Sequence, residues 1–139
     1  MHRAELSGEI VKMVGWLEAD EPFLQGAVPA EDVAKLGQLV IHTWKPPFMA
    51  GGWHDCTLCP RKPGDGPIMW DIGGQQTMLG ATEIYVPAGE VMFSAPNLIL
   101  HYIADHGYRP PEVFLAAVRK CDPHLADYHA ACDAIFQGG

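Results

Sequence analysis

The sequence predicts an α+β protein in which helices flank a short β-hairpin and a Cys-x-x-Cys loop. Apolar residues recur at helical spacing towards both ends of the chain, and two short runs of β-type composition lie between them. The 139 residues contain no internal repeat, low-complexity tract or long linker. We therefore expect one small domain over residues 1–139.

Two helices are predicted in the N-terminal part. The first lies within residues 1–20 and ends at Glu21-Pro22. Its apolar positions are Leu6, Ile10, Met13, Val14 and Leu17. The second begins near Pro29, because proline followed by acidic residues suits a first helical turn. Its apolar stripe comprises Val33, Leu36, Leu39 and Val40.

Residues 46–80 are rich in glycine and proline, so they cannot form long helices. A loop of this length in a compact domain needs something to hold it. Two β-type runs follow, Thr82–Val86 and Val91–Phe93, and Pro87–Glu90 suits the turn between them. The centre of the sequence therefore predicts an irregular segment followed by a hairpin.

Three more helices are predicted towards the C-terminus. Asn97–His106 forms the first, and Gly107 is expected to close it because glycine tolerates the left-handed conformation. The second begins at Pro110-Pro111, and the third covers Pro123–Phe136. The apolar face of the second comprises Val113, Phe114, Ala117 and Val118.

The charge balance of the chain is acidic. With 17 acidic and 9 basic residues, the formal net charge is −8. Nucleic-acid affinity comes largely from clustered Lys and Arg, so we expect no nucleic-acid partner and consider a basic protein the better match. No run approaches the ~18 apolar residues of a membrane span, and residues 1–20 lack the apolar centre of a signal peptide. We therefore expect a cytoplasmic protein without membrane association.

Four side chains form the strongest chemical pattern in the sequence. Cys56 and Cys59 are two thiols separated by two residues, and His101 and His106 lie near the end of a predicted helix. Two thiolates on a turn and two imidazoles from a helix supply the four corners of a tetrahedral zinc site. We therefore predict a Zn²⁺ ion at these four residues, which would tie the glycine- and proline-rich loop to the helix.

The spacing of the two histidines sets a condition on this prediction. Residues five apart on an ideal helix point in directions that differ by about 140°. Both imidazoles can bind one ion only if the last turn before Gly107 loosens or tightens. If it does not, His54 is the natural substitute, because it lies beside the cysteine pair.

Two other interpretations of Cys56 and Cys59 stay open. The pair could be a thioredoxin-like dithiol, with Arg61 and Lys62 lowering a thiol pKa. The proline and glycine residues that follow favour a loop over the helix such a motif needs. The pair could also form a structural disulfide, which a cytoplasmic location disfavours.

Cys121 and Cys132 form a weaker pattern. With His124 or His129 they could be part of a second metal site. Free cysteine commonly behaves as a small buried apolar residue, and we favour that interpretation here. His2 and His42 have no partner pattern.

The predicted zinc could be structural or catalytic. A catalytic zinc keeps three protein ligands and an open position for water, and Asp55, Asp105 or His54 could then serve as the base. The sequence lacks the His-Glu-x-x-His motif of metalloproteases and the deaminase signature. Four good ligands favour a closed, structural site.

Two blocks of sequence resemble a family of small bacterial proteins that has no established activity. The blocks are Gly-Trp-His-Asp-Cys-Thr-Leu-Cys at 52–59 and Ala-Pro-Asn-Leu-Ile-Leu-His-Tyr-Ile-Ala-Asp-His-Gly-Tyr-Arg-Pro-Pro at 95–111. The resemblance spans Gly51–Val118, about half the chain, and the second block is too specific for chance. It implies a bacterial origin and draws attention to the Cys and His positions, but it implies no mechanism.

These observations predict a small structural-zinc domain that binds a protein partner. The alternative is a small zinc enzyme, hydrolytic in type, with an open coordination position, and a third hypothesis is a thiol redox protein. Aromatic residues surround the predicted site in the sequence and are expected to pack the core, with an aromatic-walled pocket as the alternative. They are Trp53, Trp70, Tyr85, Phe93 and Tyr102. The sequence does not indicate an oligomeric state.

Overall fold

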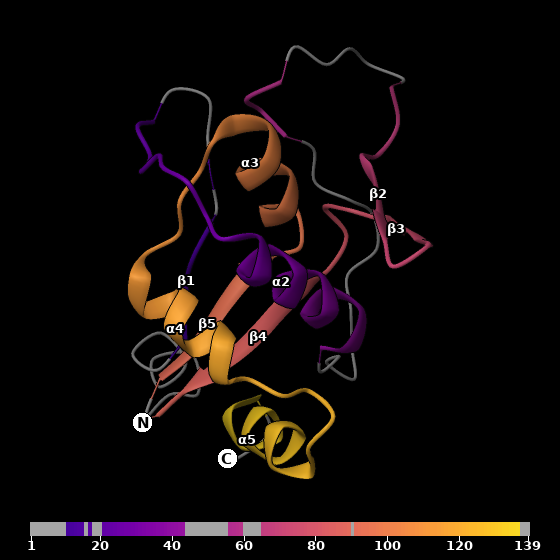
Figure 1. The fold of residues 1–139 in the computed structure, drawn as a ribbon. Coiled ribbons are helices and arrows are strands. Elements are labelled where there is room, and N and C mark those ends of the chain that lie inside the picture. The colour runs from indigo at the N-terminus through magenta and orange to yellow at the C-terminus, as the bar shows by residue number, and fades with distance from the viewer. Residues whose placement is uncertain are drawn as a thin grey trace.

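The computed structural model describes residues 11–15, 17, 21–43, 56–59, 65–89 and 91–136, and these form an α+β fold (Figure 1). This fold class confirms the prediction. The strands are β1 (Val11–Met13), β2 (Met69–Ile72), β3 (Gln75–Met78), β4 (Glu83–Ala88) and β5 (Val91–Pro96). The helices are α2 (Ala30–His42), α3 (Ile99–His106), α4 (Glu112–Lys120) and α5 (Ala126–Phe136).

The larger sheet has the strand order β1-β5-β4. β4 and β5 form the predicted hairpin, with an antiparallel register that runs from Glu83 opposite Pro96 to Ala88 opposite Val91. β1 pairs with the other edge of β5 in parallel. A separate antiparallel hairpin consists of β2 and β3.

The core lies between this sheet and the helices. α2 and α4 lie across the sheet and contact each other as well as β4 (Figure 1). The wholly buried side chains at this junction include Leu36, Leu39, Ile84, Val86, Phe114, Leu115 and Val118. Burying a side chain of this size stabilises the fold by about 1.5–3 kcal/mol. Apolar packing therefore holds this part of the molecule together.

A buried hydrogen-bond network connects α5 to the core. The hydroxyl of Tyr128 donates to the carbonyl of Tyr85 at 2.7 Å and lies 2.8 Å from the hydroxyl of Thr43. The Thr43 hydroxyl accepts the backbone N–H of Tyr85 at 3.1 Å. The end of α2, the strand β4 and α5 therefore meet at one fully partnered polar cluster.

The predicted N-terminal helix is wrong where the structure describes it. Val11–Met13 is the strand β1, and the N–H of Val14 donates to Ser94 at 2.9 Å to continue the pairing. Met13 is 66% exposed, although the helical pattern placed it on the apolar face. The central strand β5 offers an unpaired edge to this segment, and that distant partner outweighs the local helical spacing. Leu6 and Ile10 lie outside the described residues.

The segment predicted to be irregular contains the β2–β3 hairpin. Gly73 and Gly74 form its two-residue turn with φ values of 58° and 88°. Two consecutive positive φ angles match the twist of a hairpin, and glycine adopts them without strain. The rest of residues 46–64, apart from 56–59, lies outside the described residues.

The helices α2, α3 and α4 lie where the sequence predicts them, with small shifts of their ends. Val113 is an exception to the predicted face of α4, because it is 66% exposed and Leu115 is buried in its place. α5 begins at Ala126 rather than Pro123. Among the described residues, none of the helices combines the length and apolarity that crossing a bilayer requires.

Candidate metal centre

The structure brings the four predicted ligands together. The Sγ atoms of Cys56 and Cys59 and one ring nitrogen each of His101 and His106 all lie within 4.8 Å of one another. In the described part of the chain, this is the one group of three or more such side chains placed to hold a metal ion. Cys56 and His101 are buried, and the other two are partly exposed.

The separations of the donor atoms fit a small tetrahedral ion. The Cys59 Sγ lies 3.1 Å from the His101 Nε2 and 3.2 Å from the His106 Nε2. The Cys56 Sγ lies 3.5 Å from the His106 Nε2, and the two Nε2 atoms are 3.2 Å apart. Zinc bonds of about 2.3 Å to sulfur and about 2.0–2.1 Å to nitrogen place neighbouring donors about 3.3–3.8 Å apart at tetrahedral angles. The four separations, 3.1–3.5 Å, lie at or slightly below this range, so the cluster is close in size to a zinc coordination shell.

Cys56 and Cys59 reach the cluster because the chain turns between them. Residues 57 and 58 form this turn, as the predicted site requires. The segment 56–59 lies beside α3 in Figure 1, although about forty residues of sequence separate the two. The four side chains therefore connect two distant parts of the chain.

The end of α3 explains how two histidines five residues apart face the same point. The N–H of Gly107 donates to the carbonyl of Tyr102, five residues earlier, instead of the four of a regular helix. The N–H of Tyr108 donates to the same carbonyl at 3.1 Å. This wider last turn brings His106 towards His101. The helix end therefore loosens, which is one of the two changes that the spacing of the histidines requires. His54 and Asp55 lie outside the described residues.

Gly107 permits this turn, because its φ of 67° is in the left-handed region. The neighbouring segment 24–27 also supports it. The N–H of Gly26 donates to the carbonyl of Gly107 at 3.1 Å, and the side-chain amide of Gln25 donates to the carbonyl of His106 at 3.3 Å. This support could not be predicted from local sequence patterns, because the contact joins residues far apart in the chain.

Asp105 orients one of the imidazoles. Its Oδ2 lies 2.7 Å from the Nδ1 of His101. A proton held on Nδ1 by this carboxylate leaves the lone pair of Nε2 directed at the cluster. Asp105 is half exposed. Asp105 is therefore placed to orient the metal ligand His101 and not to bind the metal itself.

Electrostatics favours the neutral form of His106, which is the form that binds a metal. Partial burial lowers the pKa of the His106 imidazole, and the neighbouring His101 lowers it further, while Asp105 partly opposes both effects. A neutral imidazole keeps its lone pair available at neutral pH.

The β2–β3 hairpin packs against the beginning of α3. The Trp70 ring lies edge-on to the His101 ring, with centroids 6.5 Å apart. Asn97 anchors the start of α3: its Oδ1 accepts the N–H of Gly80 at 2.6 Å, and its Nδ2 donates to the carbonyl of Met78 at 3.1 Å. The supporting role of Asn97 was not predicted from the sequence. An asparagine at the start of a helix usually indicates a helix cap, whereas this side chain holds the chain at Met78 and Gly80.

The other two cysteines do not join a metal cluster in the described residues, and both are buried. Burial raises the pKa of the Cys121 thiol to about 11 and that of Cys132 to about 12. The His129 ring donates to the carbonyl of Pro123 at 2.8 Å, and the His124 ring lies tilted against His42, with centroids 4.5 Å apart. The buried-thiol interpretation is confirmed for this pair.

Comparison with known proteins gives one match. The model of a family described as a domain of unknown function (DUF7919) matches residues 2–119, a range that includes all four candidate ligands and ends before α5. No curated protein and no solved structure matches the chain. The match agrees with the resemblance of the two sequence blocks to a family without an established activity. The chain belongs to the DUF7919 family.

Proposed function

We propose that this protein is a small binding module stabilised by one structural Zn²⁺ ion, with Cys56, Cys59, His101 and His106 as the ligands. One observation carries the proposal. The four donor atoms lie within 4.8 Å of one another although they come from two distant segments. Such a convergence of two thiols and two imidazoles has an ordinary chemical purpose in proteins, which is to hold a metal.

The donor set favours zinc over other biological cations. Thiolate and imidazole ligands suit Zn²⁺, whereas Mg²⁺ and Ca²⁺ prefer oxygen ligands. Two thiolates also balance the charge of the ion. The imidazoles of His101 and His106 are placed to bind through Nε2, and the carboxylate of Asp105 supports the first of them.

The number of ligands favours a structural role. Four protein donors complete a tetrahedron, whereas a catalytic zinc keeps one position for water. The ion would join the turn at 56–59 to α3, in which Ile99, Leu100 and Tyr102 are buried in the core. A metal in this position would hold the turn at 56–59, in the glycine- and proline-rich part of the sequence, against the core.

The acidic composition supports a protein partner with a basic surface. The chain carries a formal net charge of −8, which attracts cationic surfaces and speeds their association. The same charge disfavours nucleic acids and anionic membranes. In this proposal the metal stabilises the fold, and the function of the protein is to bind its basic partner.

Elemental analysis of protein purified without added metal tests the site. We expect about one zinc per chain in the native protein, and loss of most of it in Cys59→Ser and His101→Ala. Cys121→Ala and His124→Ala are matched controls, because they remove the same residue types outside the cluster, and they should keep the metal. Equal zinc loss in the control variants, or a native protein without metal, would overturn the proposed ligand set.

A hydrolytic zinc enzyme predicts a different result. Its metal would exchange a bound water for small anions such as azide without loss of fold. A structural site with four protein ligands should bind no azide at concentrations that leave the circular dichroism spectrum unchanged.

A further inference from the structure

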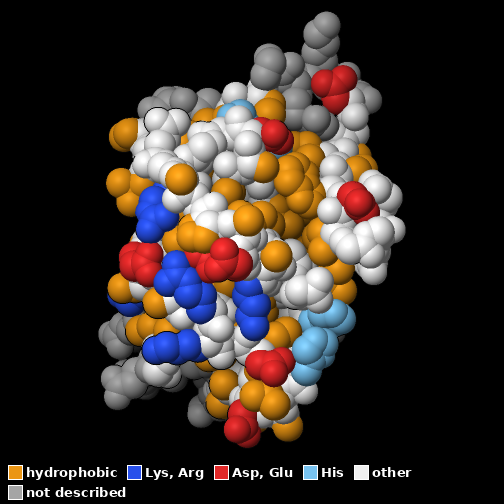
Figure 2. All heavy atoms as spheres, viewed as in Figure 1, with side chains coloured by type: hydrophobic (Ala, Val, Ile, Leu, Met, Phe, Trp, Pro, Cys, Tyr) orange, Lys and Arg blue, Asp and Glu red, His pale blue; other side chains and the backbone are white. Residues whose placement is uncertain are grey.

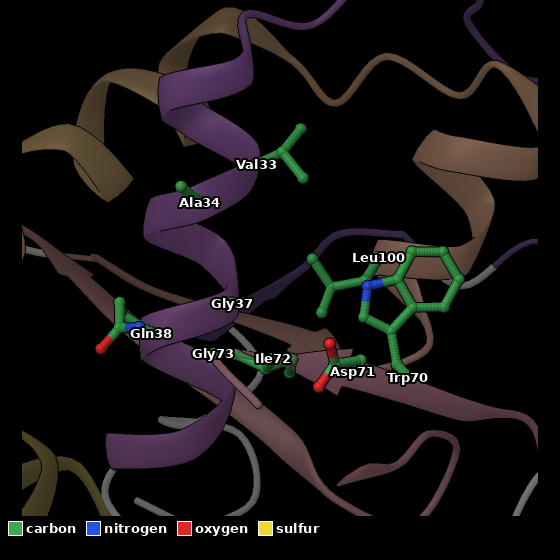
Figure 3. A pocket seen from close by; sticks show the side chains of 9 residues that line it. All are labelled: Val33, Ala34, Gly37, Gln38, Trp70, Asp71, Ile72, Gly73 and Leu100. Atoms are coloured by element: carbon green, nitrogen blue, oxygen red, sulfur yellow. The ribbon is translucent and has the colours of Figure 1, made fainter. Parts of the chain in front are cut away.

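A cleft lies between α2 and the β2–β3 hairpin, next to the candidate metal centre (Figure 3). Its volume is about 220 Å³. Val33 and Gly37 of α2, Ile72 and Trp70 of the hairpin, and Leu100 of α3 line its apolar part. Figure 2 shows hydrophobic side chains gathered in the hollow between α2 and the hairpin. The cleft is smaller than the pockets of about 300–1,000 Å³ that take drug-sized ligands, and it matches one long side chain.

Gly37 allows the hairpin to approach α2. A Cβ atom at this position would lie 3.3 Å from the Cγ2 of Ile72. Any larger residue would push against this wall of the cleft. The half-buried indole of Trp70 forms the facing wall. The cleft is therefore flanked by an aromatic ring and an aliphatic surface.

One carboxylate lies at the cleft. Asp71 is one of the lining residues and is exposed (Figure 3). Within the residues that the structure describes, the Asp71 carboxylate forms no ion pair and no side-chain hydrogen bond. The cleft therefore combines apolar walls, an indole and an exposed carboxylate, a combination that suits a cation with an apolar stem.

We propose that this cleft binds an arginine side chain of the basic partner. The methylene stem would contact the aliphatic wall, and the planar guanidinium would lie on Trp70 while it pairs with Asp71. The inference rests on the proposed binding function and specifies the chemistry that the partner presents. It also gives the metal a role in recognition, since Trp70 contacts His101 and Leu100 precedes that ligand in α3.

A titration followed by nuclear magnetic resonance tests the proposal. Zinc-containing, ¹⁵N-labelled protein is titrated with the capped peptide Gly-Ser-Arg-Ser-Gly and with two matched peptides, in which citrulline or norleucine replaces the arginine. We expect the arginine peptide to shift the indole N–H of Trp70 and the amide of Gly37. Citrulline has the same shape without the charge and should bind about tenfold more weakly, as expected when one charge-assisted pair is lost.

Two variants identify the contact. Asp71→Asn should weaken arginine binding about tenfold. Asp127→Asn removes an exposed carboxylate from α5 and serves as the matched control, so it should leave the affinity unchanged. Equal weakening in both variants would mean that the peptide is attracted by the overall charge, and would contradict the cleft as the binding site. Equal affinity for the norleucine and arginine peptides would show that the site binds an apolar side chain, and would contradict the proposed arginine ligand.

The zinc content of the same samples separates this inference from the proposed function. If the protein contains one zinc but the peptide causes no resonance shifts, arginine binding in the cleft is contradicted and the proposed metal site is not. A folded protein that binds the arginine peptide without containing zinc supports the cleft and contradicts the structural metal.

Discussion

The core under α2 and α4 and the candidate metal centre on α3 depend on different kinds of interaction. In the core, wholly buried apolar residues such as Leu36 and Phe114 pack without directional bonds, and each contributes a modest part of the free energy of folding. At the candidate metal centre, four polar side chains converge on one point, and each would be needed to complete a tetrahedral site. A packed core loses stability gradually when residues are truncated, whereas a four-ligand site fails when one ligand is lost.

Removal of the metal should produce the largest effect. Structural zinc sites contribute about 10–16 kcal/mol in small zinc domains, as much as the whole stability of a typical protein. Because α3 belongs to both regions, we expect a chelator such as 1,10-phenanthroline to unfold the protein, measured by circular dichroism. Added zinc should restore the signal. A chelated protein with an unchanged melting temperature would contradict the proposed coupling of the two regions.

Truncation in the core should be costly but should leave the metal bound. Phe114 is wholly buried and lies edge-on to Phe93, with ring centroids 5.5 Å apart. Phe114→Ala should therefore lower the free energy of unfolding by about 3–5 kcal/mol in urea titrations. Val113→Ala, at an exposed position of the same helix, is the control and should cost less than about 0.5 kcal/mol. Loss of zinc from Phe114→Ala while it is still folded would show that the two regions are less separate than we describe.

A supporting residue of the metal centre should have an intermediate effect. Asp105 holds the Nδ1 of His101, so Asp105→Asn should weaken zinc affinity by about 10–100-fold without changing the number of ligands. Competition with a fluorescent zinc chelator measures this affinity. Asp122→Asn is a control at a distant exposed carboxylate. Unchanged affinity in Asp105→Asn would mean that the carboxylate does not orient the ligand.

The smallest effect concerns the ion pair between α2 and α4. Arg119 donates to both oxygens of buried Asp32 at 3.0 and 2.8 Å. This hydrogen bonding holds the pKa of Asp32 below its usual value of 3.8, against the opposing effect of burial. The lowered pKa means that the pair stabilises the fold above pH 3.8, and this stabilisation is lost as the pH falls towards the folded-state pKa.

Comparison of native protein with Asp32→Asn isolates this contribution. We expect a difference of about 1–2 kcal/mol in the free energy of unfolding at neutral pH, which should shrink as the pH falls below 3.8. Because we expect the fold to require its zinc, the two proteins are compared only at pH values at which both still contain the metal. Glu112→Gln removes an exposed partner of Arg119 and should change stability by at most about 0.5 kcal/mol. A difference that grows in acid would contradict the direction of the pKa shift.

Local sequence patterns predicted the features that depend on neighbouring residues. The caps and periodicity of α2, α3 and α4 depend on residues within a few positions, and so does the β4–β5 hairpin. The four metal-site residues were recognisable because their chemistry is unusual at that spacing. Gly73-Gly74 was a usable turn pattern that the polar residues around it obscured.

The features that could not be predicted depend on distant contacts. β1 is a strand because it pairs with β5, whose sequence lies far along the chain. Helical periodicity in a short segment carries no information about such a partner. The wider last turn of α3 likewise depends on the contacts of Gly107 and Tyr108 with Tyr102, and on support from Gln25. In both places the tertiary structure determined the local conformation.

The absorption spectrum of the Co²⁺-substituted protein tests the central claim most directly. One equivalent of Co²⁺ bound by two thiolates and two imidazoles should give intense visible bands of a tetrahedral site and sulfur-to-metal charge-transfer bands in the near ultraviolet. Cys59→Ser should lose most of both sets of bands at one equivalent of Co²⁺, because a four-ligand site that lacks one thiolate no longer holds the ion tightly. A weak spectrum typical of an octahedral ion with oxygen and water ligands would contradict a closed four-ligand site.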